Sequence, residues 1–299
     1  MNPEKIFSIS SEQDFNEVAL EIFRFQYANN SVYRKFSDLL KIDPKHVDKI
    51  ENIPFLPIDL FKSHTILSSA EKIKKTFTSS GTTGSKTSKH HVTDLSIYEK
   101  SFNLGFQKFY GDIQDYAVLA LLPSYLERDG SSLIYMAQHL IENSKHPSSG
   151  FYLDNLTELK EKLISLDGKG QKVLLIGVSF ALLDLVEDFQ FKLKNTIVME
   201  TGGMKGRRKE MIREELHSIL KNGFGVETIH SEYGMTELLS QAYSAGYGVF
   251  DCPPWMKILI RDPEDAQSYL LNNSTGGINV IDLANINSCS FIATQDLGK

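Results

Sequence analysis

One short segment of the chain concentrates side chains that bind phosphate groups. It holds six hydroxyl side chains, two glycines and a lysine, in the order Thr78, Ser79, Ser80, Gly81, Thr82, Thr83, Gly84, Ser85 and Lys86. Glycine lets main-chain N–H groups turn toward a bound anion, hydroxyls are rotatable donors, and lysine adds a point charge. A polyphosphate requires this chemistry, although the same composition is also typical of a solvated surface loop.

The spacing of the glycines excludes two common nucleotide-binding patterns. The Walker pattern requires a glycine directly before the lysine, and Ser85 occupies that place. The dinucleotide pattern is G-x-G-x-x-G, whereas Gly81 and Gly84 are spaced G-x-x-G. The segment instead resembles the Thr-Ser-Gly-Thr-Thr-Gly signature of the adenylate-forming enzymes, which convert a carboxylic acid and ATP into an acyl adenylate.

Further segments resemble signatures of the same superfamily, in the same order. Residues 231–237 read Ser-Glu-Tyr-Gly-Met-Thr-Glu, and Asp296 stands in an Asp-Leu-Gly turn. Because the signatures follow one another across most of the chain, the chain is identified as a member of the adenylate-forming superfamily. Residues 53–58, 122–128 and 252–256 resemble its acyl-protein synthetase (LuxE-type) branch, which includes the fatty-acid-activating subunit of bacterial luminescence reductase systems.

The elements that must position these residues alternate along the chain. Apolar runs predict strands at 117–122, 173–178, 196–199, 226–230, 258–260 and 278–282, and helices are predicted at 131–142, 156–166, 180–188 and 207–220. Another helix is predicted behind the capping residues Ser10 and Ser11. This alternation favours an α/β fold with largely parallel sheets flanked by helices. The resemblance implies one large N-terminal domain of an adenylate-forming enzyme over 1–299, with a seam between two lobes near 190–195.

At the phosphate end, the resemblance implies that residues 78–84 wrap the β- and γ-phosphates of ATP. Lys86 would add a cation, although Lys89 competes for that role because Ser85 stands where the family often has a proline. Thr236 would donate to the α-phosphate, where charge builds up. Glu237 would hold Mg²⁺, a hard cation that prefers one or two carboxylates plus phosphate oxygens.

At the nucleoside end, the resemblance implies contacts with adenine and ribose. Tyr233 would lie against the adenine face, a stacking contact worth about 1–3 kcal/mol in nucleic-acid systems. Asp296 would accept hydrogen bonds from the ribose hydroxyls. The resemblance also implies that Gly202, Gly203, Gly234 and Met235 bind the nucleotide. The glycines of 200–206 also fit a strand-to-helix turn without a ligand, and that alternative stays open.

Histidine and cysteine give no further site. His90 and His91 point to different faces of a strand or helix and lack partners at metal-ligand spacing, so both are expected at the surface. His230 could line the acyl pocket or simply end its strand. Cys252 and Cys289 are interpreted as buried structural thiols rather than thioester-forming nucleophiles.

Composition excludes several classes of protein. A net charge of −6 argues against a nucleic-acid binder. The chain has no secretory signal and no apolar run of the roughly 18 residues that a membrane span needs. Two cysteines in 299 residues suit a reducing compartment. We therefore expect a soluble cytoplasmic protein.

The predicted function is ATP-dependent activation of a carboxylic acid, with a fatty acid preferred, and acyl transfer to a protein thiol. ATP and Mg²⁺ are the expected cofactors, and an acyl-acceptor protein or reductase subunit is the expected partner. The alternatives are a CoA ligase of the arylacetate type and a non-catalytic ATP-binding subunit. Because the sequence ends at Lys299, we expect the family's small C-terminal domain, with its adenylation lysine, to be absent or truncated, and adenylation to be slow.

Overall fold

A computed structural model describes residues 3–79, 86–122, 130–153, 155–202, 208–209, 211–270 and 273–299. The chain divides into two compact units, which are described one at a time. Unit 1 consists of Met1–Phe102, Met235–Ser240 and Cys252–Lys299, and unit 2 consists of Asn103–Gly234 and Gln241–Asp251. The seam expected near 190–195 falls inside unit 2. The assignment of the whole chain to one domain stays a prediction.

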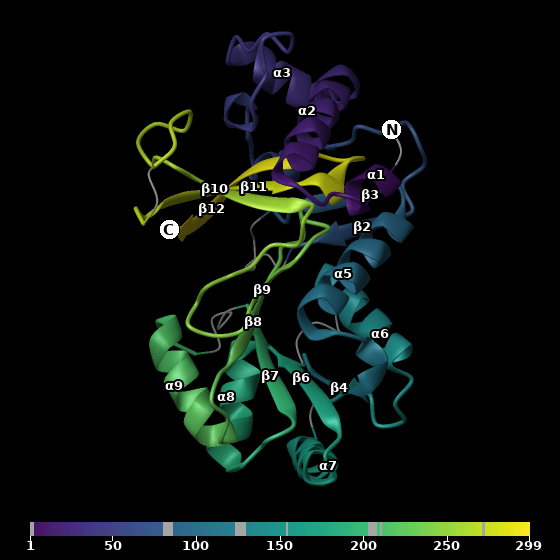
Figure 1. The fold of residues 1–299 in the computed structure, drawn as a ribbon, viewed down its shortest axis with the longest axis vertical. Helices are drawn as coiled ribbons and strands as arrows, with labels where there is room; N and C mark the ends of the chain where they lie inside the picture. The colour runs from purple at the N-terminus through teal and green to yellow at the C-terminus, as the bar shows by residue number, and fades with distance from the viewer. Residues whose placement is uncertain are drawn as a thin grey trace. The chain divides into compact units, whose positions relative to one another are not determined.

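Unit 1 contains a four-stranded sheet in the order β1-β12-β11-β10. Figure 1 labels three of its strands, β10, β11 and β12. Its strands are β1 (Leu56–Pro57), β10 (Met256–Arg261), β11 (Gly276–Asp282) and β12 (Phe291–Gly298). The first strand runs parallel to β12, and the other neighbours are antiparallel. The unit also holds an antiparallel pair, formed by β2 (Lys75–Thr78) and β3 (Lys89–Val92).

The helices of unit 1 are α1 (Glu4–Phe7), α2 (Glu12–Asn29), α3 (Ser31–Leu39) and α4 (Leu60–Ser63). The predicted cap of the first long helix is confirmed: the Ser11 hydroxyl accepts the N–H of Asp14, and the Asp14 carboxylate accepts the N–H of Ser11. Short 3₁₀ turns lie at Ile50–Asn52 and Leu283–Asn285. Rings from distant segments form the core, where Tyr33 stacks on Phe291 with centroids 6.1 Å apart.

Unit 2 contains a six-stranded sheet in the order β5-β4-β6-β7-β8-β9. Its strands are β4 (Tyr116–Leu121), β5 (Gly150–Phe151), β6 (Lys172–Gly177), β7 (Thr196–Thr201), β8 (His230–Tyr233) and β9 (Ala242–Ser244). All neighbours are parallel except β8 and β9. The predicted parallel sheet is therefore confirmed, because fully buried strands such as β4 read as continuous apolar runs.

Helices flank the sheet of unit 2 (Figure 1). They are α6 (Ser132–Ser144), α7 (Leu156–Gly168), α8 (Ser179–Asp188) and α9 (Arg213–Phe224), and α5 (Leu95–Tyr110) is divided between the two units. Helix α6 contacts β4, α7 contacts β6, and α8 contacts β7 and α9. Within the described part of the chain, no helix has the length and apolar character needed to cross a membrane.

Two predicted boundaries are wrong. The strand predicted at 226–230 is instead β8, which starts at His230, because Gly225 ends α9 in a left-handed conformation (φ 67°) and the next residues connect back to the sheet. The helix predicted from 207 begins at Arg213. The preceding residue, Ile212, has extended backbone, and Arg208 lies outside the helix and binds Asp184 and Glu187 of α8.

Candidate functional site

Most of the predicted phosphate loop lies outside the described residues. This holds for Ser80, Gly81, Thr82, Thr83, Gly84 and Ser85, and for Gly203 in the later glycine-rich segment. The base of the loop is described, and it is closed by two hydrogen bonds. The N–H of Ser88 donates to the Ser79 hydroxyl at 2.9 Å, and the N–H of Ser79 donates to the Ser88 carbonyl at 3.2 Å. Thr78 ends β2, and the side chain of Lys86 is exposed.

The described site residues fall into two groups. Unit 1 holds Thr78, Ser79, Lys86, Met235, Thr236, Glu237 and Asp296. Unit 2 holds Gly202, Tyr233 and Gly234. In unit 1 the Glu237 carboxyl lies close to Ser88 and is influenced by the charge of Asp296, and in unit 2 Thr201 and Glu232, which precede Gly202 and Tyr233, are paired on neighbouring strands.

Glu237 is the buried acid of the unit 1 group, with only 5% of its surface exposed. Burial raises the pKa of the Glu237 carboxyl, and the negative charge of Asp296 acts in the same direction. A hydrogen bond with Ser88 and the positive charge of Lys62 oppose this rise in pKa. The carboxylate therefore lies in a polar environment built by β12, α4 and the residues just before β3.

Lys62 is a member of this environment that sequence analysis did not identify. Its ammonium group donates to the Asp59 carboxylate at 2.7 Å, and the Gln295 amide donates to the other oxygen of Asp59 at 2.6 Å. The parallel pairing of β1 with β12 places α4 beside the last residues of β12, because α4 follows β1 directly. Asp296 itself is exposed at this end of β12, and its N–H donates to the Thr294 hydroxyl at 3.2 Å.

The main chain of the second signature is held by buried side chains of unit 1. The carbonyl of Thr236 contacts Nδ1 of His90 at 2.8 Å, and the carbonyl of Glu237 accepts from the Asn285 amide at 2.6 Å. Neither His90 nor Asn285 was identified from the sequence. No local pattern links them to the signature, since one stands on β3 and the other in the 3₁₀ turn after β11.

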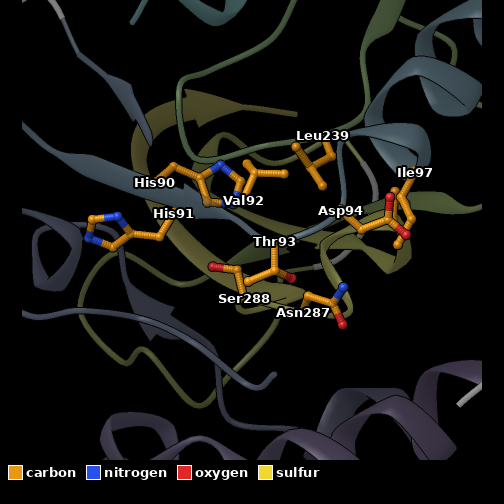
Figure 2. A pocket seen from close by; sticks show the side chains of 10 residues that line it. His90, His91, Val92, Thr93, Asp94, Ile97, Leu239, Asn287 and Ser288 are labelled. Atoms are coloured by element: carbon orange, nitrogen blue, oxygen red, sulfur yellow. The ribbon is translucent and has the colours of Figure 1, made fainter. Parts of the chain in front are cut away.

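The expectation that His90 lies at the surface is wrong. Its side chain is 1% exposed, and burial lowers the pKa of the imidazole to about 4. Figure 2 shows His90 and His91 on one strand with their rings directed to different sides. The alternation along β3 turns His90 inward, whereas His91 is half-buried and contacts the Thr76 hydroxyl on β2 at 2.9 Å.

A small cavity beside His90 is lined in part by Thr93, Leu239 and Ser288 (Figure 2). Its volume of about 10 Å³ suits at most one water molecule, so it is no substrate pocket. Among the described residues, no three His, Cys, Asp or Glu side chains form a group that could hold a metal ion.

In unit 2, Tyr233 ends β8 next to a half-buried acid, Glu232. Its ring meets the Phe250 ring edge-on, with centroids 6.0 Å apart. The preceding residue, Glu232, accepts a hydrogen bond from the Thr201 hydroxyl on β7, and burial raises the pKa of Glu232 to about 7. A Cβ atom at Gly234 would lie 2.4 Å from Oε1 of Glu232. The glycine of this signature therefore leaves room for the Glu232 carboxyl.

The described part of the glycine-rich segment follows β7. Gly202 has a φ of 68°, which favours glycine, and its carbonyl accepts from the Ser179 hydroxyl at 3.0 Å. On β7, burial alone would raise the pKa of Glu200, but hydrogen bonds with His217 and Ser231 lower it below its usual value. These contacts form the turn without a ligand, so nucleotide binding by Gly202 stays a prediction.

The two cysteines differ in environment. Cys289 is fully buried, and burial raises the pKa of its thiol to about 12, which agrees with a structural thiol. Cys252 is half-buried. His230 contacts the Tyr110 hydroxyl through Nδ1 at 3.2 Å, and this contact does not decide between its two predicted roles.

Comparison with known proteins gives a consistent result. The model of the acyl-protein synthetase (LuxE) family matches residues 4–108. A long-chain-fatty-acid–luciferin-component ligase of Vibrio harveyi is 23% identical over 295 residues, covering 92% of this chain and 76% of the relative. A protein of the same name from Photorhabdus luminescens is 37% identical over 71 residues, covering 23% of this chain and 60% of the relative.

Solved structures share the fold. A 2-hydroxyisobutyryl-CoA ligase in complex with 2-HIB-AMP and CoA matches with a TM-score of 0.72 at 10% identity, over 96% of this chain and 64% of that chain. MatB from Rhodopseudomonas palustris, solved with ATP bound, matches with a TM-score of 0.56 at 17% identity. The match covers 77% of this chain and 46% of the MatB chain. The predicted α/β fold is confirmed, and the chain spans less than two thirds of the length of these two structures.

Proposed function

Because the acyl-protein synthetase (LuxE) family model matches residues 4–108 and the Vibrio harveyi relative aligns with 92% of the chain, we propose that the chain is of this type, activates a carboxylic acid with ATP and transfers the acyl group to a protein thiol. In the first step a carboxylate oxygen bonds to the α-phosphorus, the bond from that phosphorus to the bridging oxygen breaks, and pyrophosphate leaves. In the second step a thiolate attacks the acyl carbonyl and AMP leaves. Both reactants of the first step are anions, so the protein must align them and neutralise charge.

The observation that carries the proposal is the environment of Glu237. A carboxylate that is 5% exposed, and whose pKa is raised by burial, is unfavourable without a cation. Mg²⁺ prefers one or two carboxylates together with phosphate oxygens, and the Glu237 oxygens suit that ligand set. When bound with ATP, Mg²⁺ would neutralise the phosphate charge. Lys62, whose positive charge acts on Glu237, would also offset negative charge at this site.

The other site residues are assigned by the same proposal. Thr236 donates its hydroxyl to the α-phosphate, and Asp296 accepts from the ribose hydroxyls, for which its exposed position at the end of β12 is suitable. The β- and γ-phosphates are bound by Thr78, Ser79, Ser80, Gly81, Thr82, Thr83, Gly84 and Lys86. The adenine is bound by Gly202, Gly203, Tyr233, Gly234 and Met235.

The substrate and acceptor are proposed from the named relatives. The Vibrio harveyi and Photorhabdus luminescens proteins are named for a long-chain fatty acid, which supports a fatty acid here. The description of the matching family, acyl-protein synthetase, supports a protein as acyl acceptor. A CoA thiol is the alternative acceptor, since the 2-hydroxyisobutyryl-CoA ligase was solved with an acyl adenylate and CoA. We propose the cytoplasm as the location of the reaction, where Cys252 and Cys289 would stay reduced.

Exchange of labelled pyrophosphate into ATP tests the first step. The purified protein is incubated with ATP, Mg²⁺ and a panel of carboxylic acids that differ in chain length. Exchange that depends on a fatty acid is expected, and no exchange with any acid would contradict the proposal. Intact-protein mass spectrometry then separates the acceptors: an acyl adduct on a protein supports the thiol acceptor, whereas acyl-CoA as the sole product supports the CoA ligase.

A further inference from the structure

The main chain of Met235–Ser240 is held by hydrogen bonds to side chains from distant parts of unit 1. His90 on β3 hydrogen-bonds to the Thr236 carbonyl through Nδ1, and the Asn285 amide donates to the Glu237 carbonyl. His90 is 1% exposed and Asn285 is fully buried. A pair of buried side chains therefore controls two consecutive carbonyls of the signature.

The contact with Thr236 fixes the tautomer of His90. A carbonyl oxygen only accepts hydrogen bonds, so Nδ1 must carry the hydrogen. Burial lowers the pKa of His90 to about 4, which keeps the ring neutral near pH 7 and leaves Nε2 as an acceptor. Among the described residues, this buried Nε2 has no hydrogen-bond partner.

Asn285, like His90, donates to a main-chain carbonyl and leaves a buried acceptor atom without a partner among the described residues. Its amide nitrogen donates to the Glu237 carbonyl, so its side-chain oxygen is left as an acceptor, and that buried oxygen also has no partner among the described residues. The Asn285 side chain lies close enough to His90 to influence its pKa. With a neutral ring the nearby Nε2 and Oδ1 are both acceptors and cannot bond to each other.

Stability alone does not account for this pair. Both side chains bury a polar atom that no described residue pairs, and an apolar pair of similar shape would fill the same space without that requirement. What His90 and Asn285 do achieve is control of the peptide groups on both sides of Glu237. Polar groups that weaken the fold while fixing one segment are expected at functional sites.

We propose that His90 and Asn285 are positioning residues, which fix the Thr236 and Glu237 carbonyls and thereby aim both side chains at the nucleotide. The inference rests on the proposed function of Thr236 and Glu237. A misplacement of about 1 Å in such a site costs on the order of 10²-fold in rate. The loss of activity should appear in kcat more than in KM for ATP, because Thr236 and Glu237, the residues being positioned, are proposed to act on the reacting phosphate groups.

Two substitutions of His90 separate positioning from packing. In His90→Asn the amide nitrogen takes the place of Nδ1 and keeps the donor to Thr236, whereas in His90→Gln it takes the place of Nε2 and the donor is lost. We expect His90→Gln to lower kcat for pyrophosphate exchange by on the order of 10²-fold. We expect His90→Asn to keep most of the activity. The control is His91→Asn on the same strand, which should match the wild type.

Each outcome decides the inference. Equal kcat values for the two His90 variants would overturn it, as would full activity of His90→Gln. If His90→Gln does not fold, Asn285→Asp replaces it, because the carboxylate keeps the shape and loses the donor to Glu237. If the wild type exchanges with no acid, the proposed function fails instead. Crystal structures of the two His90 variants then decide the inference: a Thr236 carbonyl that is displaced in His90→Gln but not in His90→Asn supports it, and the same carbonyl position in both variants overturns it.

Discussion

The carboxylate of Asp282 accepts a hydrogen bond from the main-chain N–H of Leu239 at 2.7 Å. The same oxygen accepts from the N–H of Ser240 at 3.0 Å, and the other oxygen accepts from the Ser240 hydroxyl and from the N–H of Ala284. Burial raises the pKa of Asp282 to about 6, so the carboxylate form dominates at neutral pH. One fully buried acid at the end of β11 therefore holds the last residues of Met235–Ser240.

Replacing this acid should destabilise unit 1. Asp282→Asn keeps the shape but offers one acceptor oxygen, and its NH₂ group faces main-chain donors. Asparagine removes a buried charge, which is a gain, but it leaves two buried donors without an acceptor. Each unpaired donor costs about 1–3 kcal/mol, so we expect a net fall on the order of 1 kcal/mol in the free energy of unfolding in urea. Asp265→Asn is the control, because Asp265 makes a similar turn at an exposed position. Wild-type stability in Asp282→Asn would show that the contacts contribute nothing.

Glu237→Gln should separate activity from stability. Glutamine keeps the shape and loses the charge, so Mg²⁺-dependent pyrophosphate exchange should fall by on the order of 10²–10³-fold, the usual effect of removing one electrostatic group from an active site. Burial raises the pKa of Glu237, so the charged form is disfavoured in the folded protein. The melting temperature of the variant at pH 7 should therefore equal or exceed that of the wild type. Undiminished exchange would remove Glu237 from the site.

The sequence predicted much of the fold and little of what holds the site. Buried parallel strands such as β4 and β6 read as apolar runs and were placed within a residue. The strand β8 was displaced because its own residues are polar, whereas Ile229 just before it is apolar and buried outside the ladder. Apolar character marks burial, and only pairing with β7 shows where the strand begins.

The signature residues were recognised by type and spacing, but their supports were not. Asp282, Asn285 and Lys62 reach the signature segment through strand pairing and chain reversal, which leave no trace in local spacing. His90 was assigned to the surface because neither strand of the pair β2–β3 was predicted. With β3 in place, the alternation of the strand would have turned one of the two histidines inward.

The stability of unit 2 should depend on the ionisation of Glu232. Burial raises its pKa from 4.5 to about 7 in the folded protein. Below pH 4.5 the acid is neutral in both states, and as the pH rises to 7 the unfolded state ionises first, so wild-type stability falls. Glu232→Gln does not ionise and should gain on the wild type across this window, by on the order of 3 kcal/mol. Thermal unfolding of both proteins from pH 4 to 8 measures this, and a constant difference would show that Glu232 does not titrate there.

Gly234 and Glu232 should be coupled energetically. A methyl group at Gly234 would lie 2.4 Å from Oε1 of Glu232, and this half-buried carboxyl is held in place by its hydrogen bond from the Thr201 hydroxyl. Gly234→Ala alone should lower the free energy of unfolding by about 1–3 kcal/mol, the usual range for overpacking. In the double variant Gly234→Ala/Glu232→Ala the clash is absent, so the added cost of the methyl group should nearly vanish. A double-mutant cycle in urea measures the coupling. Additive effects would show that the Glu232 carboxyl does not limit the space at position 234.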